Sequence, residues 1–512
     1  MQVQHSRRDV MKLAGRSLMV AATGRVVGPS ALGRFATAAR SPVALRLAPS
    51  TTASGTYRSE PGLRPPPITV LTTADNTAPG LIVLTPSPGR DFQGGLMLAD
   101  NTGQPVWFLP RPHGPITAAS TIGVTGISST NMEVMSYEGH PVLTWWEGDI
   151  VLPGYGEGKY YLADSTYKVV KTVEAGRGLR ADLHDFYLTN RNTALLSAYD
   201  KKTADLSSVG GPRKGVVLDS LFQEIDLKTG AVVFQWRASD FVDLEESYVL
   251  PTKSQPYDFF HINSVSLDPD GNFIVSGRHT WCVYKVNRTT GAILWRLNGK
   301  SSDFAMTAGS GFAWQHHVRS LTSTELTIFD DGAGPEKTEK QSRGLKVLLD
   351  TKKRTAHLVT QLLPQPTVLA GSQGSVQELP DGHVFVGWGS APYFSEYRAD
   401  GTLLFDAQLQ EGSHSYRTYR SVWVGRPTTT PAVAAERQGA RVSVYASWNG
   451  ATEVAAWQVR VGPKANLLSP LQNFARSGFE TAMTVATDQP FVAVRALDRN
   501  GTVIGRSDAV PV

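Results

Sequence analysis

A turn that recurs six times along the chain constrains the fold more than any other feature of the sequence. Its four clearest copies are LADNTGQPVWF (98–108), EIDLKTGAVVFQW (224–236), YKVNRTTGAILWRL (284–297) and SEYRADGTLLFDAQL (395–409). Two weaker copies are LADSTYKVVKTV (162–173) and LLDTKKRTAHLVTQL (348–362). Alternating apolar residues flank a polar turn in each copy, and the clear copies place Asp or Asn and Gly where a positive φ is needed. Each copy therefore predicts a β-hairpin.

The spacing of these copies predicts a repeat architecture. Successive turns lie 46 to 64 residues apart, which is about the length of a four-stranded propeller blade with generous loops. The aromatic residue that ends each clear hairpin can pack between neighbouring blades. We therefore predict an all-β chain in which residues 76–430 form a six-bladed β-propeller. The main alternative, a long irregular β-sandwich, would not explain the repeat.

The segments on either side of this region have a different composition. Residues 39–75, with many Pro, Ser and Thr, are expected to form an irregular segment before the first blade. The stretch 426–439 has the composition of a linker. After it, two alternating stretches carry the turn signals WNG and DRNG. They predict a small immunoglobulin- or fibronectin-like β-sandwich over residues 431–512.

The first 38 residues predict a signal peptide for twin-arginine export. SRRDVMK (6–12) contains two arginines, an apolar position and a lysine, and a modestly apolar stretch and the small-x-small motif ATA (36–38) follow. Six basic residues against one acidic residue give this segment the whole formal net charge of +5. The neutral remainder argues against a nucleic-acid partner, and no later stretch is long enough to span a membrane. We expect a periplasmic, cell-surface or extracellular protein; the alternative is a disordered basic tail.

Several other residues have a structural explanation. Cys282 is the single cysteine, so an exported chain without an internal disulfide must be held by its core or by ring closure. In the apolar stretch TWCVYKV we expect Cys282 to be a small buried residue. Arg180, Lys285 and Arg319 are expected to be charges at the surface or at strand ends.

Three of the 11 histidines lie in similar local settings. His184 in ADLHDFYLT, His261 in DFFHINSVSL and His316 in FAWQHHVRSL each precede an alternating apolar strand. The first two are 77 residues apart and the second two are 55 apart, about one blade each. Because the innermost strand of each blade lines the axial channel, we expect the three imidazoles to converge there.

Arg278, about one strand after His261, would complete a receptor for a compact anion. Its planar guanidinium can bind two oxygens, and a neutral imidazole is a nucleophile and a general base near pH 7. One histidine could attack while the others protonate a leaving group and bind oxygens. Three histidines could instead bind zinc. However, no Glu-x-x-His or His-x-His spacing is present, and Arg278 would repel a cation, so we expect no metal. Each histidine taken alone could also be an ordinary hydrogen-bonded loop residue.

Together, these segments resemble the arylsulfate sulfotransferase family, the PAPS-independent bacterial sulfotransferases and their relatives in actinobacteria and fungi. The resemblance covers roughly residues 75–425. It rests on DLHDF, DFFHINSV, SGRHTWCVYKVNRTTGAILWRLNG, FAWQHHVR and GSVQELPDGHVFVGWGSAPYFSEYRADG. It implies a six-bladed propeller with an axial active site and no cofactor. It also implies ping-pong transfer of a sulfuryl group from a phenolic sulfate ester to a phenol, through a transiently sulfated histidine.

The resemblance assigns roles residue by residue. His316 resembles the sulfated nucleophile, His261 and Arg278 resemble the pair that holds the sulfuryl oxygens, and His184 resembles the remaining channel histidine. Family members commonly have Gln-His-Asp where this chain has His317 after His316. A carboxylate that could orient the nucleophilic imidazole is therefore expected to be missing. Strand alternation places the two adjacent histidines on opposite faces.

The substrate side of the site is predicted more coarsely. An aromatic donor would contact aromatic side chains, and we expect Trp314 and Phe260, together with Gln315, to bind the substrate. The partners expected are a small phenolic sulfate donor and a phenol acceptor.

Two other functions stay open from the sequence. The recurrent turn resembles the docking turn of pyrroloquinoline-quinone dehydrogenases, but those propellers have eight blades, and the acidic cluster expected for their calcium ion is not seen. A secreted binding propeller without catalytic turnover is the third possibility, against which the filled set of three histidines and one arginine argues.

Overall fold

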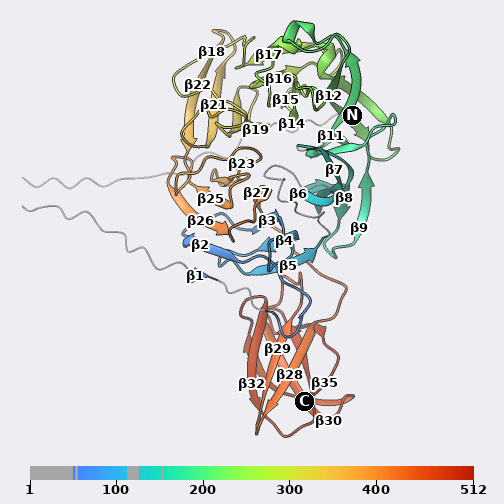
Figure 1. Ribbon diagram of the computed structural model, residues 1–512. Helices are drawn as coiled ribbons and strands as arrows, with labels where there is room; N and C mark the ends of the chain where they lie inside the picture. Colours follow the sequence, from blue (N-terminus) through green and yellow to red (C-terminus); the bar gives the residue numbers. More distant parts are fainter. Residues whose placement is uncertain (1–49, 52–55, 112–125, 153) are drawn as a thin grey trace, which may run out of the picture. The chain divides into compact units, whose positions relative to one another are not determined.

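The computed structural model describes residues 50–51, 56–111, 126–152 and 154–512, and in these residues the protein is all-β (Figure 1). The helical elements described are three short 3₁₀ turns: η1 (Ser207–Val209), η2 (Ala238–Asp240) and η3 (Leu244–Glu246). No helix of the described residues is long and apolar enough to cross a membrane. The predicted signal peptide, residues 1–38, lies outside the described residues.

Between residues 81 and 421, the described strands fall into six groups of four antiparallel strands. The first two groups are β27 (Ser415–Ser421), β3 (Leu81–Pro86), β4 (Gly95–Ala99) and β5 (Pro105–Pro110), then β6 (Gly126–Tyr137), β7 (His140–Leu152), β8 (Tyr155–Ala163) and β9 (Val169–Val173). The third and fourth are β10 (Ala181–Leu188), β11 (Thr193–Ala204), β12 (Gly215–Asp226) and β13 (Val232–Arg237), then β14 (Ile262–Leu267), β15 (Phe273–Gly277), β16 (Cys282–Val286) and β17 (Ile293–Leu297). The fifth and sixth are β19 (His316–Ser320), β20 (Glu325–Asp330), β21 (Arg343–Asp350) and β22 (Thr355–Leu362), then β23 (Ser375–Glu378), β24 (Val384–Gly387), β25 (Tyr393–Tyr397) and β26 (Leu403–Leu409).

Three short strands and one extra pairing modify this pattern. β2 (Ile68–Thr72) pairs with β26, and β1 (Ser50–Thr51) pairs with β2, so part of the segment expected to be irregular extends the sixth group. β18 (Ala305–Met306) adds to β22 in parallel. The second and third groups share one sheet because β8 also pairs with β10.

The six predicted hairpins are confirmed, because each recurrent turn joins the third and fourth strands of one group. In the clearest copy, an Oδ1 atom of Asp226 accepts hydrogen bonds from the backbone N–H groups of Lys228 and Thr229, at 3.0 and 2.7 Å. This closes the turn through a side chain and leaves Gly230 free to adopt a φ of 74°. The same type of bond recurs at Asp100, Asp164, Asn287, Asp350 and Asp400.

The innermost strands of the six groups form a closed ring of neighbours. β6 lies next to β10, and the contacts continue through β14, β19 and β23 to β27, which returns to β6. β27 follows the other groups in sequence but pairs with β3, so it completes the first group (Figure 1). The polar residues at the starts of these six strands are therefore held near one axis.

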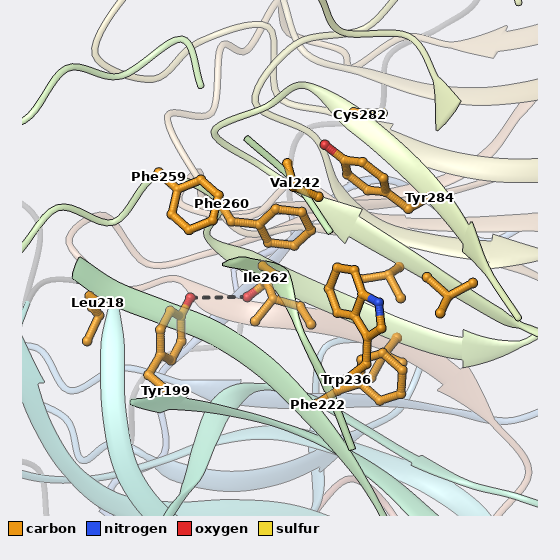
Figure 2. Close-up of a cluster of buried hydrophobic side chains, with 14 of the residues drawn as sticks. Tyr199, Leu218, Phe222, Trp236, Val242, Phe259, Phe260, Ile262, Cys282 and Tyr284 are labelled. Atoms are coloured by element: carbon orange, nitrogen blue, oxygen red, sulfur yellow. Dashed lines mark hydrogen bonds between the residues drawn. The ribbon is translucent and has the colours of Figure 1, made fainter. Parts of the chain in front are cut away.

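A large hydrophobic cluster packs between the third and fourth groups (Figure 2). Trp236 is 1% exposed, stacks near Phe222 and Phe241, and donates a hydrogen bond from Nε1 to the carbonyl of Gly291 at 3.0 Å. The aromatic residue that ends the hairpin thus packs against the next group, as the repeat predicts. Cys282 is 1% exposed on β16, which confirms that it is a buried strand residue.

Residues 432–511 form two further sheets around one hydrophobic cluster. One sheet has the order β28 (Ala432–Gln438), β29 (Arg441–Ser447) and β32 (Glu480–Ala486). The other has the order β31 (Leu467–Ala475), β30 (Ala456–Lys464), β33 (Phe491–Leu497) and β34 (Val503–Arg506), with β35 (Val510–Pro511) also on β33. Val444 and Val459, one from each sheet, are fully buried in the shared cluster. Asn449 and Phe108 exchange two hydrogen bonds of 2.9 and 2.8 Å between this part and β5.

Replacing the central tryptophan tests the packing of the third and fourth groups. We expect Trp236→Ala to lower the free energy of unfolding by about 3–5 kcal/mol, because it empties a filled site and removes the bond to Gly291. Val233→Ala on the same strand is the control, since Val233 is 53% exposed and should change stability by less than about 0.5 kcal/mol. Urea unfolding followed by tryptophan fluorescence and circular dichroism measures both, and equal effects would contradict the packing.

Candidate functional site

The starts of the innermost strands bring several polar side chains together. The imidazoles of His184, on β10, and His261, just before β14, lie 4.8 Å apart between ring centroids and nearly perpendicular. The ring of Tyr416, on β27, lies 6.0 Å from His184. His316 begins β19, and its Nε2 accepts a hydrogen bond of 3.2 Å from the backbone N–H of Gln373, which precedes β23. Five strand groups thus contribute to one buried cluster.

His316 has a defined tautomer. Because Nε2 accepts from Gln373, the ring proton lies on Nδ1, which donates to Oδ2 of Asp331 at 2.7 Å. The imidazole is 2% exposed, and Asp331, directly after β20, is fully buried. The unprotonated Nε2 therefore faces away from the carboxylate that orients the ring.

The other two histidines are each held by a carboxylate in the same way. Nδ1 of His184 contacts Oδ2 of Asp182 at 2.5 Å, and Nδ1 of His261 contacts Oδ2 of Asp258 at 2.5 Å. His261 has a φ of 54°, and the backbone at Gly154 approaches its ring so closely that a Cβ there would lie 2.9 Å from Cε1. All three imidazoles are thus oriented by a carboxylate on Nδ1. Nε2 is on the far side of each ring, and in His316 it accepts from the backbone N–H of Gln373.

Arg278 lies beside this cluster and is 7% exposed. Its guanidinium donates to the carbonyl of Gly371 at 2.8 Å and to Nε2 of His279 at 3.2 Å, and it stands over the ring of Trp314 at 5.1 Å. His279 donates from Nδ1 to the carbonyl of Asp258 at 2.6 Å. Nε of Arg278 has no partner among the described residues. A buried donor without a partner fits an anionic ligand.

Burial and mutual repulsion favour the neutral imidazoles of His261, His279 and His316. Burial, together with the nearby Arg278 and the other histidines, lowers the pKa of His316 well below its ordinary value, and burial, His184 and Arg278 do the same to the pKa of His261. Burial lowers the pKa of His279 to about 3. An anion bound among these groups would stabilise their protonated forms, so binding an anionic substrate should be coupled to proton uptake.

Burial also shifts the carboxylate partners. It raises the pKa of Asp331 well above its ordinary value, although the Arg278 guanidinium opposes the shift. Burial would likewise raise the pKa of Asp182, but the charge of His184 and hydrogen bonds from His184 and the Gly156 N–H hold it below its ordinary value. Asp331 is therefore the more basic carboxylate and is better suited to accept a proton from its imidazole.

Of the three substrate-binding residues predicted from sequence, one lies beside the cluster and two lie elsewhere. Trp314 packs under Arg278. Phe260 is fully buried in the hydrophobic cluster of Figure 2, where its ring is 5.7 Å from that of Trp236. Gln315 is fully buried, and its side-chain amide donates to the carbonyls of Gly277 and Cys282, which anchors the start of β19 to the fourth group.

Sequence reasoning missed four residues of the cluster: Asp182, Asp258, His279 and Asp331. The expectation that His316 lacks an orienting carboxylate is wrong, because Asp331 supplies it from the end of the neighbouring strand. Asp182 and Asp258 precede their histidines by two and three residues, so the local spacing Asp-x-His and Asp-x-x-His could have revealed them. Asp331 is 15 residues from His316, and only strand pairing brings it close.

His317 is held differently from its neighbour. Nδ1 accepts from the backbone N–H of Val376 at 3.2 Å, so Nε2 carries the proton and lies 3.1 Å from the hydroxyl of Tyr419. Burial and the nearby Arg319 lower the pKa of His317 well below its ordinary value. Both ring nitrogens are used within the protein, so His317 has no free lone pair for a substrate.

A second buried network joins the innermost strands further along their length, past the histidine cluster. Asp185 accepts from the guanidinium of Arg319 at 2.8 and 3.1 Å and from that of Arg417 at 2.5 Å. Arg319 was expected to be a surface or strand-end charge. It lies one residue from the end of β19, but its side chain is 16% exposed and pairs with Asp185. Lys285 likewise lies one residue from the end of β16, but it is not a surface charge, because it is 7% exposed and pairs with Asp268 at 2.7 Å.

A cavity of about 720 Å³ opens at the other ends of these strands. It is lined by residues 136–139, 187–192 and 267–269 together with Leu227, Gly271 and Ser320. None of the predicted site residues lines it, so this cavity and the histidine cluster are separate features.

Asp258, His261 and His279 are the one group in the described residues whose ligand atoms could hold a metal ion, since these atoms lie within 4.8 Å of one another. Nδ1 of His261 is already paired with the Asp258 carboxylate. The Arg278 guanidinium lies 3.2 Å from Nε2 of His279. A divalent cation would therefore bind only if this guanidinium moved away.

Comparison with known proteins identifies the family. The family model described as Arylsulfotransferase (ASST) matches residues 133–410, which is more than half of the chain. The chain belongs to this family, as the sequence motifs indicated. The match includes the three histidines and Arg278 and ends before residues 432–511. No curated protein matches the chain.

Several solved structures are similar at low identity. A protein of unknown function from Bacteroides caccae is 10% identical, with a TM-score of 0.39 over 67% of this chain and 98% of that chain. A Lactobacillus plantarum protein is 14% identical, with a TM-score of 0.32 over 79% and 99%. A periplasmic gluconolactonase of Pseudomonas aeruginosa is 13% identical, with a TM-score of 0.27 over 75% and 97%. Similarity at this level carries no argument about the activity of this chain.

The axial network should make stability depend on pH through Glu133 of β6. Burial raises the pKa of Glu133 to about 7, although Arg319 and Arg417 oppose the shift. A carboxyl group whose pKa is raised by folding stabilises the folded state at low pH, and this contribution is lost as the pH rises through 7. Between pH 5.5 and 8.5, the wild type should lose about 2 kcal/mol relative to Glu133→Gln in urea unfolding.

The matched control for this measurement is Glu138→Gln, because Glu138 is exposed in the turn after β6. Its stability relative to the wild type should not change between the two pH values. A pH-independent difference between Glu133→Gln and the wild type would contradict the burial of an ionisable group at this position.

Proposed function

We propose that the protein is a PAPS-independent aryl sulfotransferase that moves a sulfuryl group from a phenolic sulfate ester to a phenol through a sulfated His316. The observation that carries the proposal is the tautomer of His316. Its Nδ1–H donates to Asp331 and its Nε2 has a free lone pair when Gln373 releases it, among His184, His261 and Arg278. Family membership supports the transferase class.

The first half-reaction uses these groups in distinct roles. Arg278 and His261 bind the sulfuryl oxygens, and Trp314 contacts the aromatic part of the donor. Nε2 of His316 attacks sulfur, so an N–S bond forms while the bond between sulfur and the phenolic oxygen breaks. The phenolate leaves with its electron pair and takes the proton that the His184 or His261 imidazole took up when the anionic donor bound, a form of general acid help worth ~10²–10⁴-fold. The imidazole becomes cationic, and the basic Asp331 stabilises it at Nδ1.

The second half-reaction reverses these steps with a phenol acceptor. Its oxygen attacks sulfur and the N–S bond breaks, which restores the neutral imidazole. The acceptor proton returns to the imidazole that had given one up, so protons and charge balance over the cycle. No redox partner or metal is needed, and positioning and electrostatics supply most of the catalysis, by analogy with phosphoryl transfer.

The finer architecture belongs to the same proposal. The six four-stranded groups and the closed ring of their inner strands support a six-bladed propeller over residues 76–430. The two sheets around one cluster support a small β-sandwich over residues 431–512. We propose that residues 1–38 direct export through the twin-arginine pathway, because their sequence has the required pattern.

The adjacent histidines offer a matched test of the nucleophile. With p-nitrophenyl sulfate as donor, phenol as acceptor and no PAPS, the wild type should release nitrophenolate in a phenol-dependent way. His316→Ala should lose about 10³-fold or more in kcat/KM, because it removes the attacking atom. His317→Ala should keep most of the activity, although losing its two buried hydrogen bonds should lower stability by about 1–3 kcal/mol.

Trapping the intermediate separates chemistry from folding in this test. Mass spectrometry of protein quenched with donor alone should find a sulfuryl adduct on the peptide containing His316 in the wild type and in His317→Ala. An active His316→Ala variant, or an adduct on another residue, would refute the assignment.

The carboxylate that orients the nucleophile gives a second prediction. Asp331→Asn should lower kcat by about 10²–10⁴-fold with little change in KM, because the amide favours the wrong tautomer of His316. Asp330→Asn is the control, since Asp330 pairs with Arg343 and contacts no imidazole. Steady-state kinetics on both folded variants measures the difference, and equal losses in kcat would point to a purely structural role for Asp331.

A further inference from the structure

Three arginines gather on one face of the carboxyl-terminal sheet that contains β30, β33 and β34. Arg460, Arg495 and Arg506 come one from each strand. Arg495 is directly opposite Arg506 in the register, and Arg460 is opposite Ala493, two residues from Arg495 on the same face. The alternating neighbours Val459, Val461, Val494 and Ala496 are the buried ones. The three guanidinium groups therefore point away from the hydrophobic cluster and lie close together.

These charges are not neutralised within the protein. None of the three arginines forms an ion pair with a carboxylate in the part of the chain that the structure describes. Arg460 donates to the carbonyl of Leu468, and Arg495 reaches Oε1 of Gln458 at 3.4 Å. The Nε atoms of both arginines lack a partner among the described residues. Burial and the charges of Arg495 and Arg506 lower the pKa of Arg460, so the three cations repel one another.

The opposite sheet has a different charge. Its strands carry two acidic and two basic residues, Glu436 and Arg437 of β28, Arg441 of β29 and Glu480 of β32. Glu436 pairs with Arg58, and Glu480 accepts from Ser59. The excess of positive charge is therefore on the sheet that contains β30, β33 and β34. Like charges placed directly opposite each other on neighbouring strands destabilise a sheet, so an anionic partner that neutralises them would stabilise it.

We infer that this face of β30, β33 and β34 binds an acidic polysaccharide. Guanidinium groups on adjacent strands, about 5 Å apart across the sheet, match the anionic groups of an extended polymer and can bind each one through two N–H donors. The amides of Gln458 and Asn473 are opposite each other in the register and are joined by a hydrogen bond of 3.2 Å from Gln458 Nε2 to Asn473 Oδ1. Their remaining N–H groups and lone pairs can bind sugar hydroxyls. The sheet lies outside residues 133–410, so this binding function is separate from the transferase site.

The test measures binding of the full chain to dextran sulfate, with uncharged dextran of the same length as the reference ligand. The variant Arg460→Gln, Arg495→Gln, Arg506→Gln should bind dextran sulfate at least tenfold more weakly than the wild type. The wild-type affinity should fall steeply as salt is raised, because bound counterions are released. A control with the same charge change, Lys337→Gln, Lys340→Gln, Lys352→Gln, removes exposed lysines elsewhere and should stay within twofold of the wild type.

The single reversal Arg506→Glu guards against a variant that fails to fold, because Arg506 is exposed on the short strand β34. It should weaken binding more than tenfold while the urea midpoint stays unchanged. Unchanged binding in either arginine variant, or equal loss in the lysine control, would overturn the inference. Tighter binding to phosphatidylglycerol vesicles or duplex DNA through the same arginines would also overturn it, since the partner would then be a lipid surface or a nucleic acid.

Discussion

The buried ion pairs of Asp185 hold the centre of the structure together. Its carboxylate accepts from Arg319 of β19, Arg417 of β27 and the backbone N–H of Val265 on β14, so four of the six inner strands meet at one side chain. Removing one partner would leave an uncompensated buried charge, which costs about 3–5 kcal/mol in comparable cases. The pairs therefore specify how the inner strands are placed more than they add net stability.

The Asp185 network also affects the chemistry that is possible at the histidine cluster. The network fills the space between the inner strands next to the histidines. The histidines therefore lie in a poorly solvated environment, where burial lowers the pKa of His261 and of His316. Neutral imidazoles are nucleophiles and bases, and each is oriented through Nδ1. The same burial makes Asp331 basic. A single physical cause, exclusion of water from the axis, thus shifts the pKa both of His316, the proposed nucleophile, and of Asp331, the group proposed to stabilise its cationic form.

The parts predicted from sequence are those set by local interactions. The hairpins were predictable because an Asp such as Asp226 and a Gly such as Gly230 close each turn within a few residues. The spacing of His184, His261 and His316 also follows from the repeat. The partner Asp331 was not predictable, because its contact depends on the register between β19 and the residues after β20. Arg319 was misjudged because strand alternation does not distinguish an axial face from a solvent face.

The adjacent histidines His316 and His317 show that the register of β19 determines how each imidazole is hydrogen-bonded. His316 and His317 have the same side chain and neighbouring positions, yet one keeps Nε2 unprotonated beside Arg278 and the other donates from Nε2 toward Tyr419. His317 has a φ of 45°, and the pairing of β19 with β20 is irregular after His316. A regular strand would alternate the two rings between faces with no such bend. The irregularity lets both rings be buried with both nitrogens hydrogen-bonded, but Nε2 is an acceptor in His316 and carries the proton in His317.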